Sequence, residues 1–549
     1  MYTSVRAISS RQLKHASVWS LAATSRYSSL RDYSTVDSNS RSHPKPESPE
    51  SAGWALKAFL LGLAIPSFGW AVNNYLAKSS NNRSSSELQH TQYGSAQDFK
   101  QAVAELQSTF ATHDGVVSLD PAVLHQHGFS VNDYHDGLSH SVVVYPQSTQ
   151  DVVKIVNISR KFRMPIVPYS GATSLEGHFI GATGGGICLD MSEMDAILEL
   201  HGIPLFFPLD PSPGATLGGM LSTGCSGMVL PSGEVIKTRR RARKSSAGFD
   251  TTKLFIGAEG TLGIVTEVTI RLAPLLPTNV AVAQFPDVET ATRASIDVMN
   301  RGVGIRASIV SSLTWMISSP AHSLTECVEL CDDNFMRATN KYGQSQRKWP
   351  EKDSLFFKFQ GPSQLALDET ARIVKEVVEK HGGTGFSLAA NAKEAADLWA
   401  DRKNAHYSGL ALVEGSKGWA TDVCVPVSNL PRLVQETKRD LAELGIVSTI
   451  VGHIGDGNFH CLLLFKNEEE QAIVRDAVHK MVERAISLDG TCTGEHGVGI
   501  GKREYLYEEL GEGTVELMKT IKRTLDPLNL FNPGKLYPDA LVTKEPARS

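Results

Sequence analysis

The chain has 549 residues, a length that predicts roughly three to four domains of ordinary size. Its 41% hydrophobic and 21% charged residues are ordinary globular usage, which excludes collagen-like, coiled-coil and wholly disordered chains. Lys and Arg (54) against Asp and Glu (59) give a formal net charge of -5, so we expect no nucleic acid as a partner. The 7 cysteines are odd in number and scattered, a pattern that favours reduced thiols over a disulfide scaffold.

The first part of the chain has the composition of a targeting sequence. Residues 1–35 are rich in Arg, Ser and Ala, and no acidic residue occurs among the first 31, which is typical of a mitochondrial transit peptide. A disordered tail with a chance charge bias is the alternative. Residues 36–53 form a polar linker that is rich in Pro and Ser.

A mostly apolar run follows the linker. Residues 54–76 contain the stretch WALKAFLLGLAIPSFGWAV, which is just long enough to cross a hydrocarbon core of ~30 Å and has Trp near both ends. We interpret this segment as a single transmembrane anchor in the inner mitochondrial membrane. Because Lys57 and Pro66 interrupt the run, a buried or interfacial helix is the alternative.

The next part of the chain alternates between helices and strands. The spacing of apolar residues predicts a helix over 98–110, a short strand over 141–145 and a helix over 147–162. Ser148 or Thr149 lies where the second helix needs a cap. This order of elements is typical of an α/β unit.

Three segments of small residues come next. Residues 165–178 read as a strand that leads into the loop SGATSLEGH, and similar small-residue segments occupy 210–227 and 257–267. Such loops leave backbone N–H groups unshielded, which suits a pyrophosphate. The first loop is not G-x-G-x-x-G, so a Rossmann nucleotide site is not supported. Together the loops predict a backbone cradle for a long, flat ligand that carries phosphate.

These loops, together with VYPQSTQDV at 144–152, resemble the FAD-binding domain of the vanillyl-alcohol-oxidase/PCMH flavoprotein family. The resemblance implies that residues 95–275 form a PCMH-type domain of two subdomains with FAD as its cofactor. The residues that the resemblance assigns to FAD binding are Pro168, Gly171, Thr173, Ser174, Leu175, Gly177, His178, Pro211, Gly214, Thr216, Gly218, Gly219, Gly224, Ser226, Gly260, Gly263, Ile264 and Val265.

The sequence departs from the family pattern at three places. Segments that the family has after positions 200 and 227 are missing, and both would line the flavin. Residues 306–326 look inserted, with a surface loop as the plain alternative. Because a deleted core strand would leave buried backbone groups unpaired, we interpret the gaps as a faulty gene prediction or the mark of a damaged paralogue.

Residues 276–540 are expected to form a second domain of the α+β class. Alternating and helical periodicities predict its elements. In chain order these are a strand over 354–361, a helix over 365–381, a helix over 391–409, a strand from Thr421, a helix over 430–445 and a strand from Ser448.

The stretch IVGHIGDGNFHCLLLF at 450–465 predicts a β-hairpin. Residues 455–458 (Gly-Asp-Gly-Asn) are a strong turn signal between two apolar runs. If these four residues form the loop, His453 lies directly opposite His460, and two imidazoles so placed can chelate one divalent cation. A single strand histidine is more often structural, but an opposed pair favours metal. Glu495, in the segment TGEHGVG, is at hand as a third ligand.

The hairpin and GEHGVG resemble the C-terminal domain of the FAD-linked 2-hydroxyacid dehydrogenases, and the match covers about residues 95–540. The resemblance implies that His453, His460 and Glu495 bind a divalent metal, zinc or manganese, and that His496 acts as the base. It also implies that Asn532, in the tail FNPGKLYP, contacts the flavin.

The resemblance implies oxidation of D-lactate to pyruvate by hydride transfer to FAD, with electrons passed to cytochrome c. Arg402 is placed to grip the substrate carboxylate in a bidentate pair, with a solvated helix arginine as the alternative. An imidazole with its ordinary pKa near about 6.5 suits His496 to proton abstraction. Other D-2-hydroxy acids (2-hydroxyglutarate or glycolate) and an inactive, membrane-tethered paralogue are the alternative functions.

Overall fold

The computed structural model describes residues 93–130, 133–198, 205–206, 216–217, 227–240, 245–270, 272–301 and 325–539. The transit peptide, linker and membrane anchor expected within residues 1–76 lie outside these ranges, as do residues 306–324 of the expected insert and the gap after residue 200. No helix in the described ranges has both the length and the apolar character that crossing a membrane requires.

The first domain contains a four-stranded sheet with the order β1-β2-β4-β3. Its strands are β1 (Val117–Ser118), β2 (Val142–Val144), β3 (Ile166–Tyr169) and β4 (Ile187–Asp190). Both β2 and β3 run parallel to β4. Helices α3 (Ala96–Thr109) and α5 (Thr149–Phe162) bury apolar side chains in the core of this domain, as predicted. Ser148 is the cap of α5, because its side chain accepts a hydrogen bond from the Asp151 N–H.

Smaller elements complete the first domain. Strand β6 (Gly227–Val229) lies between β7 (Val235–Ile236) and β8 (Ile264–Glu267), and its pairing with β8 shifts register between Gly227 and Met228, where the second gap is expected. The remaining elements are α4 (Pro121–Gly128), β5 (Leu205–Phe206), β9 (Ala273–Pro274) and short 3-10 turns at Met191–Glu193 and Thr251–Leu254. The tail of the chain returns here, because Phe531 forms a parallel bridge with Ile166 of β3.

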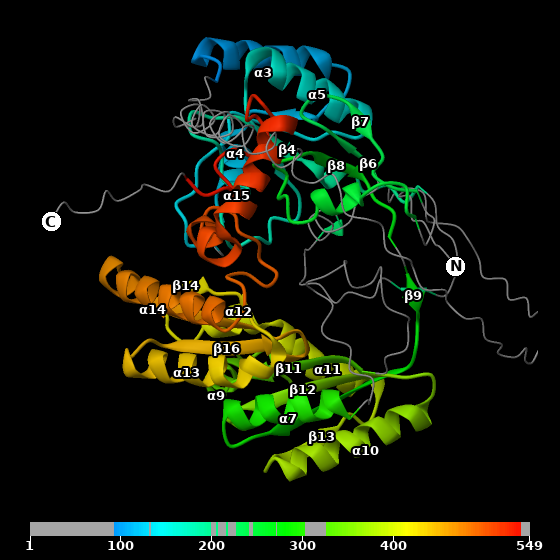
Figure 1. The fold of residues 1–549 in the computed structure, drawn as a ribbon, viewed down its shortest axis with the longest axis vertical. Coiled ribbons are helices and arrows are strands. Elements are labelled where there is room, and N and C mark those ends of the chain that lie inside the picture. The colour runs from blue at the N-terminus through cyan, green and yellow to red at the C-terminus, as the bar shows by residue number, and fades with distance from the viewer. Residues whose placement is uncertain are drawn as a thin grey trace, which may run out of the picture. The chain divides into compact units, whose positions relative to one another are not determined.

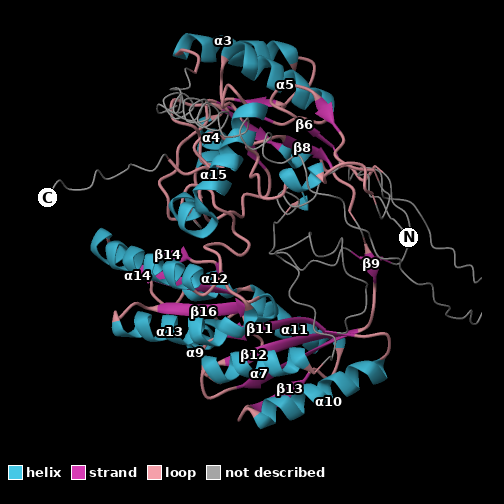
Figure 2. Cartoon of the chain, viewed as in Figure 1, coloured by secondary structure: helices cyan, strands magenta, loops and turns pink. Residues whose placement is uncertain are grey.

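The second domain is built on an eight-stranded antiparallel sheet with the order β13-β10-β12-β11-β16-β17-β14, and β15 also pairs with β17. Figure 2 labels β13, β12, β11, β16 and β14 of this sheet. The strands are β10 (Thr278–Gln284), β11 (Thr325–Cys331), β12 (Ser354–Gln360), β13 (Thr384–Leu388), β14 (Lys417–Ala420), β15 (Val423–Cys424), β16 (Ser448–His453) and β17 (Asn458–Phe465).

Helices cover both faces of this sheet (Figure 1). One face packs against α7 (Val288–Asn300), α10 (Gln364–Lys380), α13 (Leu430–Glu443) and α14 (Glu468–Ser487). The other packs against α9 (Asp333–Tyr342) and α11 (Ala392–Lys403). The chain also forms α12 (Ala405–Leu410), α15 (Leu506–Leu525, with a break at Gly511) and 3-10 turns at Val427–Asn429, Ile454–Asp456 and Arg503–Tyr505.

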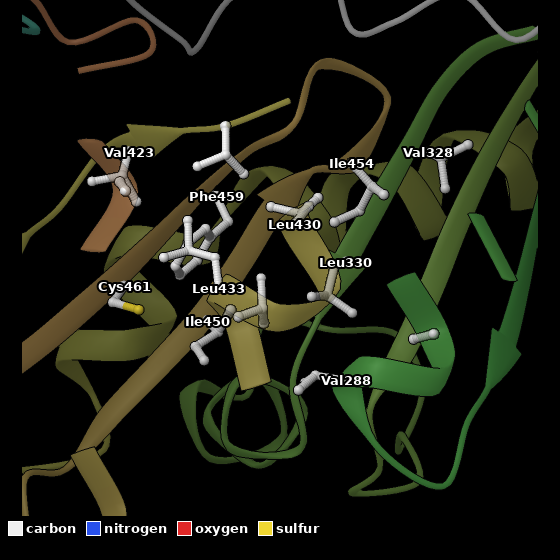
Figure 3. Close-up of a cluster of buried hydrophobic side chains, with 14 of the residues drawn as sticks. Val288, Val328, Leu330, Val423, Leu430, Leu433, Ile450, Ile454, Phe459 and Cys461 are labelled. Atoms are coloured by element: carbon white, nitrogen blue, oxygen red, sulfur yellow. The ribbon is translucent and has the colours of Figure 1, made fainter. Parts of the chain in front are cut away.

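Alternation along the strands builds the larger core. Val328 and Leu330 of β11 and Ile450 of β16 point to the same face and meet Val288 of α7 and Leu433 of α13 (Figure 3). Successive strand residues point to opposite faces, so the residues between these apolar positions lie on the other face of the sheet. That second face carries the candidate site.

Two predicted elements differ in the structure, although the α+β class is confirmed. The helix expected over 391–409 is two helices that meet at Asn404, which ends α11 and precedes α12. Asn has a low helix propensity, and the ψ of 16° at Asn404 interrupts the helix there. The strand expected from Thr421 is limited to the two residues of β15, which pair with β17.

Candidate active site

Three neighbouring strands bring Glu329, His453 and His460 to one face of the large sheet. Glu329 of β11 lies directly opposite His453 of β16 in the strand register. In β17, Phe459 and Cys461 enter the core on the first face, so His460 between them points to the second face. The side chains of Glu329, His453 and His460 therefore lie outside the apolar core on the first face.

The predicted register of the hairpin is wrong by two residues. His453 pairs with Asn458, and His460 pairs with Val451. The turn consists of Ile454–Asp456 and Gly457, whose φ of 77° needs glycine and whose Cα lies so close to Val425 that a Cβ would overlap the Val425 carbonyl oxygen. The two histidines are therefore diagonal neighbours on one face, with ring centroids 5.2 Å apart.

The three predicted metal ligands converge despite the shifted register. His453 Nε2 lies 3.3 Å and His460 Nε2 lies 3.1 Å from the same oxygen, Oε1 of Glu495. One ligand atom from each of the three residues lies within 4.8 Å of the others. Two imidazole nitrogens and a carboxylate are a donor set that zinc and other divalent metals prefer.

The second nitrogen of each imidazole has its own acceptor. His453 Nδ1 donates to Glu329 Oε1 at 2.9 Å, and His460 Nδ1 donates to the Thr421 carbonyl oxygen at 3.1 Å. With Nδ1 bonded to an acceptor, Nε2 of each ring is the nitrogen available to a cation, which is how metal-binding histidines are usually oriented. The residues therefore fit a divalent cation.

Mutual charges shift the ionisation of this cluster. Burial acts to raise the pKa of Glu495, but His453 and His460 hold that pKa well below its ordinary value. Burial acts to lower the pKa of His453, but the carboxylates of Glu329 and Glu495 raise it well above its ordinary value. The carboxylate form of Glu495 is therefore favoured, as a ligand requires, whereas His453 would have to give up a proton to bind a cation.

His496 lies beside the three ligands. Its ring stacks on that of His460, with centroids 4.9 Å apart and an angle of 9° between the planes. Burial lowers the pKa of His496 to about 4, against the partly compensating charge of Asp422. This value is below the ordinary one assumed from the sequence, so the imidazole is neutral at neutral pH. Its buried Nδ1 has no hydrogen-bond partner within the described ranges.

Asp422 is a residue of the site that the sequence analysis missed. Its buried carboxylate accepts hydrogen bonds from the backbone N–H groups of Glu495 and His496, both at 2.7 Å, and from Thr493 Oγ1 at 2.8 Å. Its other oxygen accepts from Asn458 Nδ2 at 2.7 Å. Asp422, His460 and His496 also lie close enough to hold an ion, but both Asp422 oxygens already serve donors. Asp422 instead fixes the loop that carries the site.

Arg402 lies at the end of α11 and is held by a partner that the sequence did not suggest. Its Nε and Nη2 both donate to Glu329 Oε2, at 3.1 and 2.7 Å. Glu329 therefore joins Arg402 to His453. The only sequence signal for Glu329 and Asp422 is a single acidic residue inside an apolar strand-like run, CVELC and TDVCVPV.

The loops assigned to FAD meet in the first domain. Gly260 has a φ of 70°, and a Cβ there would overlap Pro168 at the end of β3. His178 contacts Ser174 through Nδ1 and Glu259 Oε2 through Nε2, the latter at 3.0 Å. Ser170 Oγ lies 2.5 Å from Thr216 Oγ1, so a residue of the second loop reaches the first.

Asn532 joins this group from the tail of the chain. Its backbone N–H donates to the Ile166 carbonyl oxygen and its Nδ2 to the Glu259 carbonyl oxygen, both at 2.8 Å. Its buried Oδ1 has no donor within the described part of the chain. An unpaired buried acceptor beside convergent small-residue loops fits a ligand that carries N–H groups, as a flavin ring does.

The other residues assigned to FAD fall into two groups. Those on the first loop or at the start of β8 are Gly171, Thr173, Leu175, Gly177, Gly263, Ile264 and Val265. Ile264 is packed into the core of the first domain, so only its backbone is available to a ligand. Those outside the described ranges are Pro211, Gly214, Gly218, Gly219, Gly224 and Ser226.

Comparisons with known proteins agree with this arrangement. Residues 140–203 match a family model described as an FAD binding domain, and residues 319–536 match the C-terminal domain of FAD linked oxidases. The mitochondrial D-lactate dehydrogenase [cytochrome] of Arabidopsis thaliana is 37% identical, covering 88% of this chain and 91% of that protein. The mitochondrial D-lactate dehydrogenase [cytochrome] 1 of Saccharomyces cerevisiae is 37% identical, covering 72% of each.

The fold has counterparts among solved structures. A 4-ethylphenol oxidase from Gulosibacter chungangensis superimposes with a TM-score of 0.62 at 17% identity, covering 82% of this chain and 99% of that chain. At this identity the likeness concerns the fold alone. The family models and the relatives at 37% identity show the family as well as the fold. The chain belongs to the FAD-linked oxidases, in the group that contains the mitochondrial D-lactate dehydrogenases (cytochrome).

Proposed function

We propose that this protein oxidises D-lactate to pyruvate, with FAD as the hydride acceptor and cytochrome c as the electron acceptor. The names of the relatives support the substrate and the acceptor. The observation that carries the proposal is the meeting of His453, His460 and Glu495 around one point beside His496. Such a site serves a reaction in which an alcohol loses a proton while its carbon loses a hydride.

FAD, when bound, accepts the hydride from the substrate Cα. Pro168, Gly260 and Asn532 are proposed to line its site together with the loop at 170–178. The close approach of Gly260 to Pro168 and the unpaired Oδ1 of Asn532 support this placement.

A divalent metal, zinc or manganese, is proposed to be held by His453, His460 and Glu495. When bound, such an ion supplies Lewis acidity to a substrate hydroxyl. Three protein ligands leave a further coordination position for substrate, which is the pattern of catalytic rather than structural sites. Glu329 and the Thr421 carbonyl fix both imidazoles for this purpose.

His496 is proposed to accept the hydroxyl proton. His496 is adjacent in sequence to Glu495, one of the three proposed ligands. Asp422 accepts hydrogen bonds from the backbone N–H groups of both Glu495 and His496. Arg402 is proposed to bind the substrate carboxylate. A guanidinium has five N–H donors, so its pairing with Glu329 through two of them is compatible with this role.

The protein is proposed to act in mitochondria, attached to the inner membrane. The Arg- and Ser-rich residues 1–35 and the apolar residues 54–76 support this location. Fractionation of cells that make the full chain tests it: the protein should sediment with mitochondria and resist extraction by alkaline carbonate. Release by carbonate would contradict the anchor but not the mitochondrial address.

Anaerobic mixing of the full-length protein with D-lactate tests the reaction. We expect the flavin absorbance of the purified protein to bleach with D-lactate and to return when oxidised cytochrome c is added. L-lactate is the control for stereochemistry. Bleaching by glycolate or D-2-hydroxyglutarate in place of D-lactate would move the proposal to that substrate. A colourless preparation that does not take up FAD would contradict the enzymatic proposal and favour an inactive paralogue.

A further inference from the structure

The loop at 493–499, which carries Glu495 and His496, is held by two buried carboxylates. Asp422 binds its first half through the backbone of Glu495 and His496. Glu259 binds its second half, because its two oxygens accept the N–H groups of Val498 at 2.6 Å and Gly499 at 2.9 Å. Asp422 belongs to the second domain, whereas Glu259 belongs to the loop of the first domain that resembles an FAD-binding motif.

Several contacts fix the position of the Glu259 carboxylate. His178 Nε2 lies 3.0 Å from Glu259 Oε2, so the carboxylate serves three donors while its side chain is only 8% exposed. A Cβ on Gly497 would lie 2.7 Å from His178 Nε2 and 2.8 Å from Glu259 Oε1. The loop can approach this pair so closely only because residue 497 is glycine.

The backbone of Glu259 supports the same view. Its φ is 50°, in the left-handed region that disfavours residues with a Cβ, while its neighbours Gly257 and Gly260 also have positive φ. Glycine would be the unstrained choice at position 259. A glutamate held in this strained conformation indicates a role for its side chain, because strain of this kind collects at functional sites. Its carbonyl oxygen also accepts from Asn532, a proposed flavin contact.

We infer that Glu259 is a positioning residue that locks the loop of Glu495 and His496 onto the FAD-binding domain. The inference rests on the proposed function. In the proposed reaction a bound FAD would supply the hydride acceptor and His496 the proton acceptor, so the FAD-binding domain and the loop of His496 must be held at a fixed separation. Glu259 binds the loop through two hydrogen bonds from the domain proposed to hold the flavin, and it sets that separation without touching the reacting atoms.

Two substitutions separate the carboxylate from the backbone strain. Glu259→Gln keeps the strain and the shape but replaces one acceptor oxygen by a donor that faces N–H groups. Glu259→Gly removes the carboxylate and relieves the strain, so it protects the test against a failure of folding. Glu193→Gln, at an exposed position of the same domain, is the matched control.

Hydrogen exchange of full-length, FAD-loaded protein provides a readout that does not depend on turnover. We expect peptides that cover 493–500 to exchange about tenfold faster in both Glu259 variants than in wild type and in the control. The rate of flavin reduction at saturating D-lactate should fall on the order of 10²-fold, the effect of a displacement of about 1 Å, while KM changes little.

Three outcomes would overturn the inference. Unchanged exchange at 493–500 would show that Glu259 does not hold the loop. Normal flavin reduction despite faster exchange would show that the loop needs no anchor on the first domain. Loss of FAD from both variants would make Glu259 a cofactor-binding residue instead. If D-lactate fails to reduce wild-type flavin, the proposed function falls, and the exchange data alone decide whether Glu259 holds the loop.

Discussion

Glu329 shows how one buried carboxylate can orient two functional side chains. It accepts from Nδ1 of His453 and from two nitrogens of Arg402, and its position opposite His453 is set by the pairing of β11 with β16. Burial acts to raise the pKa of Glu329, but His453 and Arg402 lower it, so the carboxylate remains charged. A neutral residue could not serve both partners equally well.

Replacing Glu329 should therefore weaken metal binding. We expect Glu329→Gln to lower metal affinity about 10- to 100-fold, the range seen when a partner of a metal-binding histidine is removed. Competition with a chromogenic chelator measures the affinity. Glu379→Gln, at an exposed position on α10, is the control and should leave it unchanged. Equal affinity in wild type and Glu329→Gln would mean that His453 needs no such support.

His140 should make stability depend on pH. Its buried Nε2 donates to the carbonyl oxygens of His127 and Phe179, both at 3.1 Å, and burial lowers its pKa to about 4, with smaller contributions from Lys535 and His127. A depressed pKa means that the unfolded chain binds the proton more readily, so stability is present above pH 6.5 and is lost as the pH falls toward 4.

The expected loss between pH 7 and pH 5 is about 2 kcal/mol from this residue. Urea unfolding at the two values measures it, and His140→Gln removes the titrating group. The variant should lose less stability than wild type over this interval, by about that amount. An identical loss in both proteins would show that His140 titrates normally in the folded state.

The helices and strands that could be predicted from sequence are those with an uninterrupted periodicity. The elements expected over 147–162, 354–361, 365–381 and 430–445 occur within a few residues of their predicted ends. The hairpin register could not be predicted, because it depends on Gly457 meeting Val425, a residue just after β15 and outside the hairpin. The sequence around the hairpin alone does not reveal this contact.

The contribution of that contact can be measured with two glycines of similar backbone. Gly457→Ala places a Cβ against the Val425 carbonyl oxygen at a φ of 77°, whereas Gly445→Ala adds a Cβ at a φ of 70° with no atom within 4 Å. Both should lower the free energy of unfolding by about 1 kcal/mol through backbone strain, and Gly457→Ala by more. Only Gly457→Ala should also weaken metal binding. Equal losses would show that the turn has room to relax.

The site as a whole was only partly predictable from sequence. His453, His460, Glu495 and His496 lie in two compact motifs, so their meeting was expected. The carboxylates of Glu329, Asp422 and Glu259 come from three separate segments, and nothing in the sequence links them to those motifs. Their roles follow from the fold, because strand pairing and loop contacts decide which donors each carboxylate meets.

The last part of the chain contacts the first domain through Lys522, a buried lysine that is also paired with Asp526. Lys522 of α15 donates to Asp526 Oδ2 at 2.6 Å and to the carbonyl oxygens of Thr261 and Phe531 at 2.9 and 2.8 Å. Removing one member of a buried pair leaves the other uncompensated. We expect Lys522→Met to lower the free energy of unfolding by about 3 kcal/mol and to reduce the FAD content of purified protein.

Thermal or urea unfolding and the ratio of flavin to protein absorbance measure these effects. Lys253→Met, at an exposed position of the first domain, is the control. The double variant Lys522→Met with Asp526→Asn should recover part of the loss, because the unpaired charge is gone. No loss in the single variant would show that the tail is held by its other contacts.

The bridge between Phe531 and Ile166 has a consequence for how the protein is made. Strand β3 is translated long before Phe531 and Asn532, the residues that pair with its edge. We therefore expect the proposed flavin site to form only after residues 531–532 have been translated, so that FAD binds after that point and not while the first domain is being made.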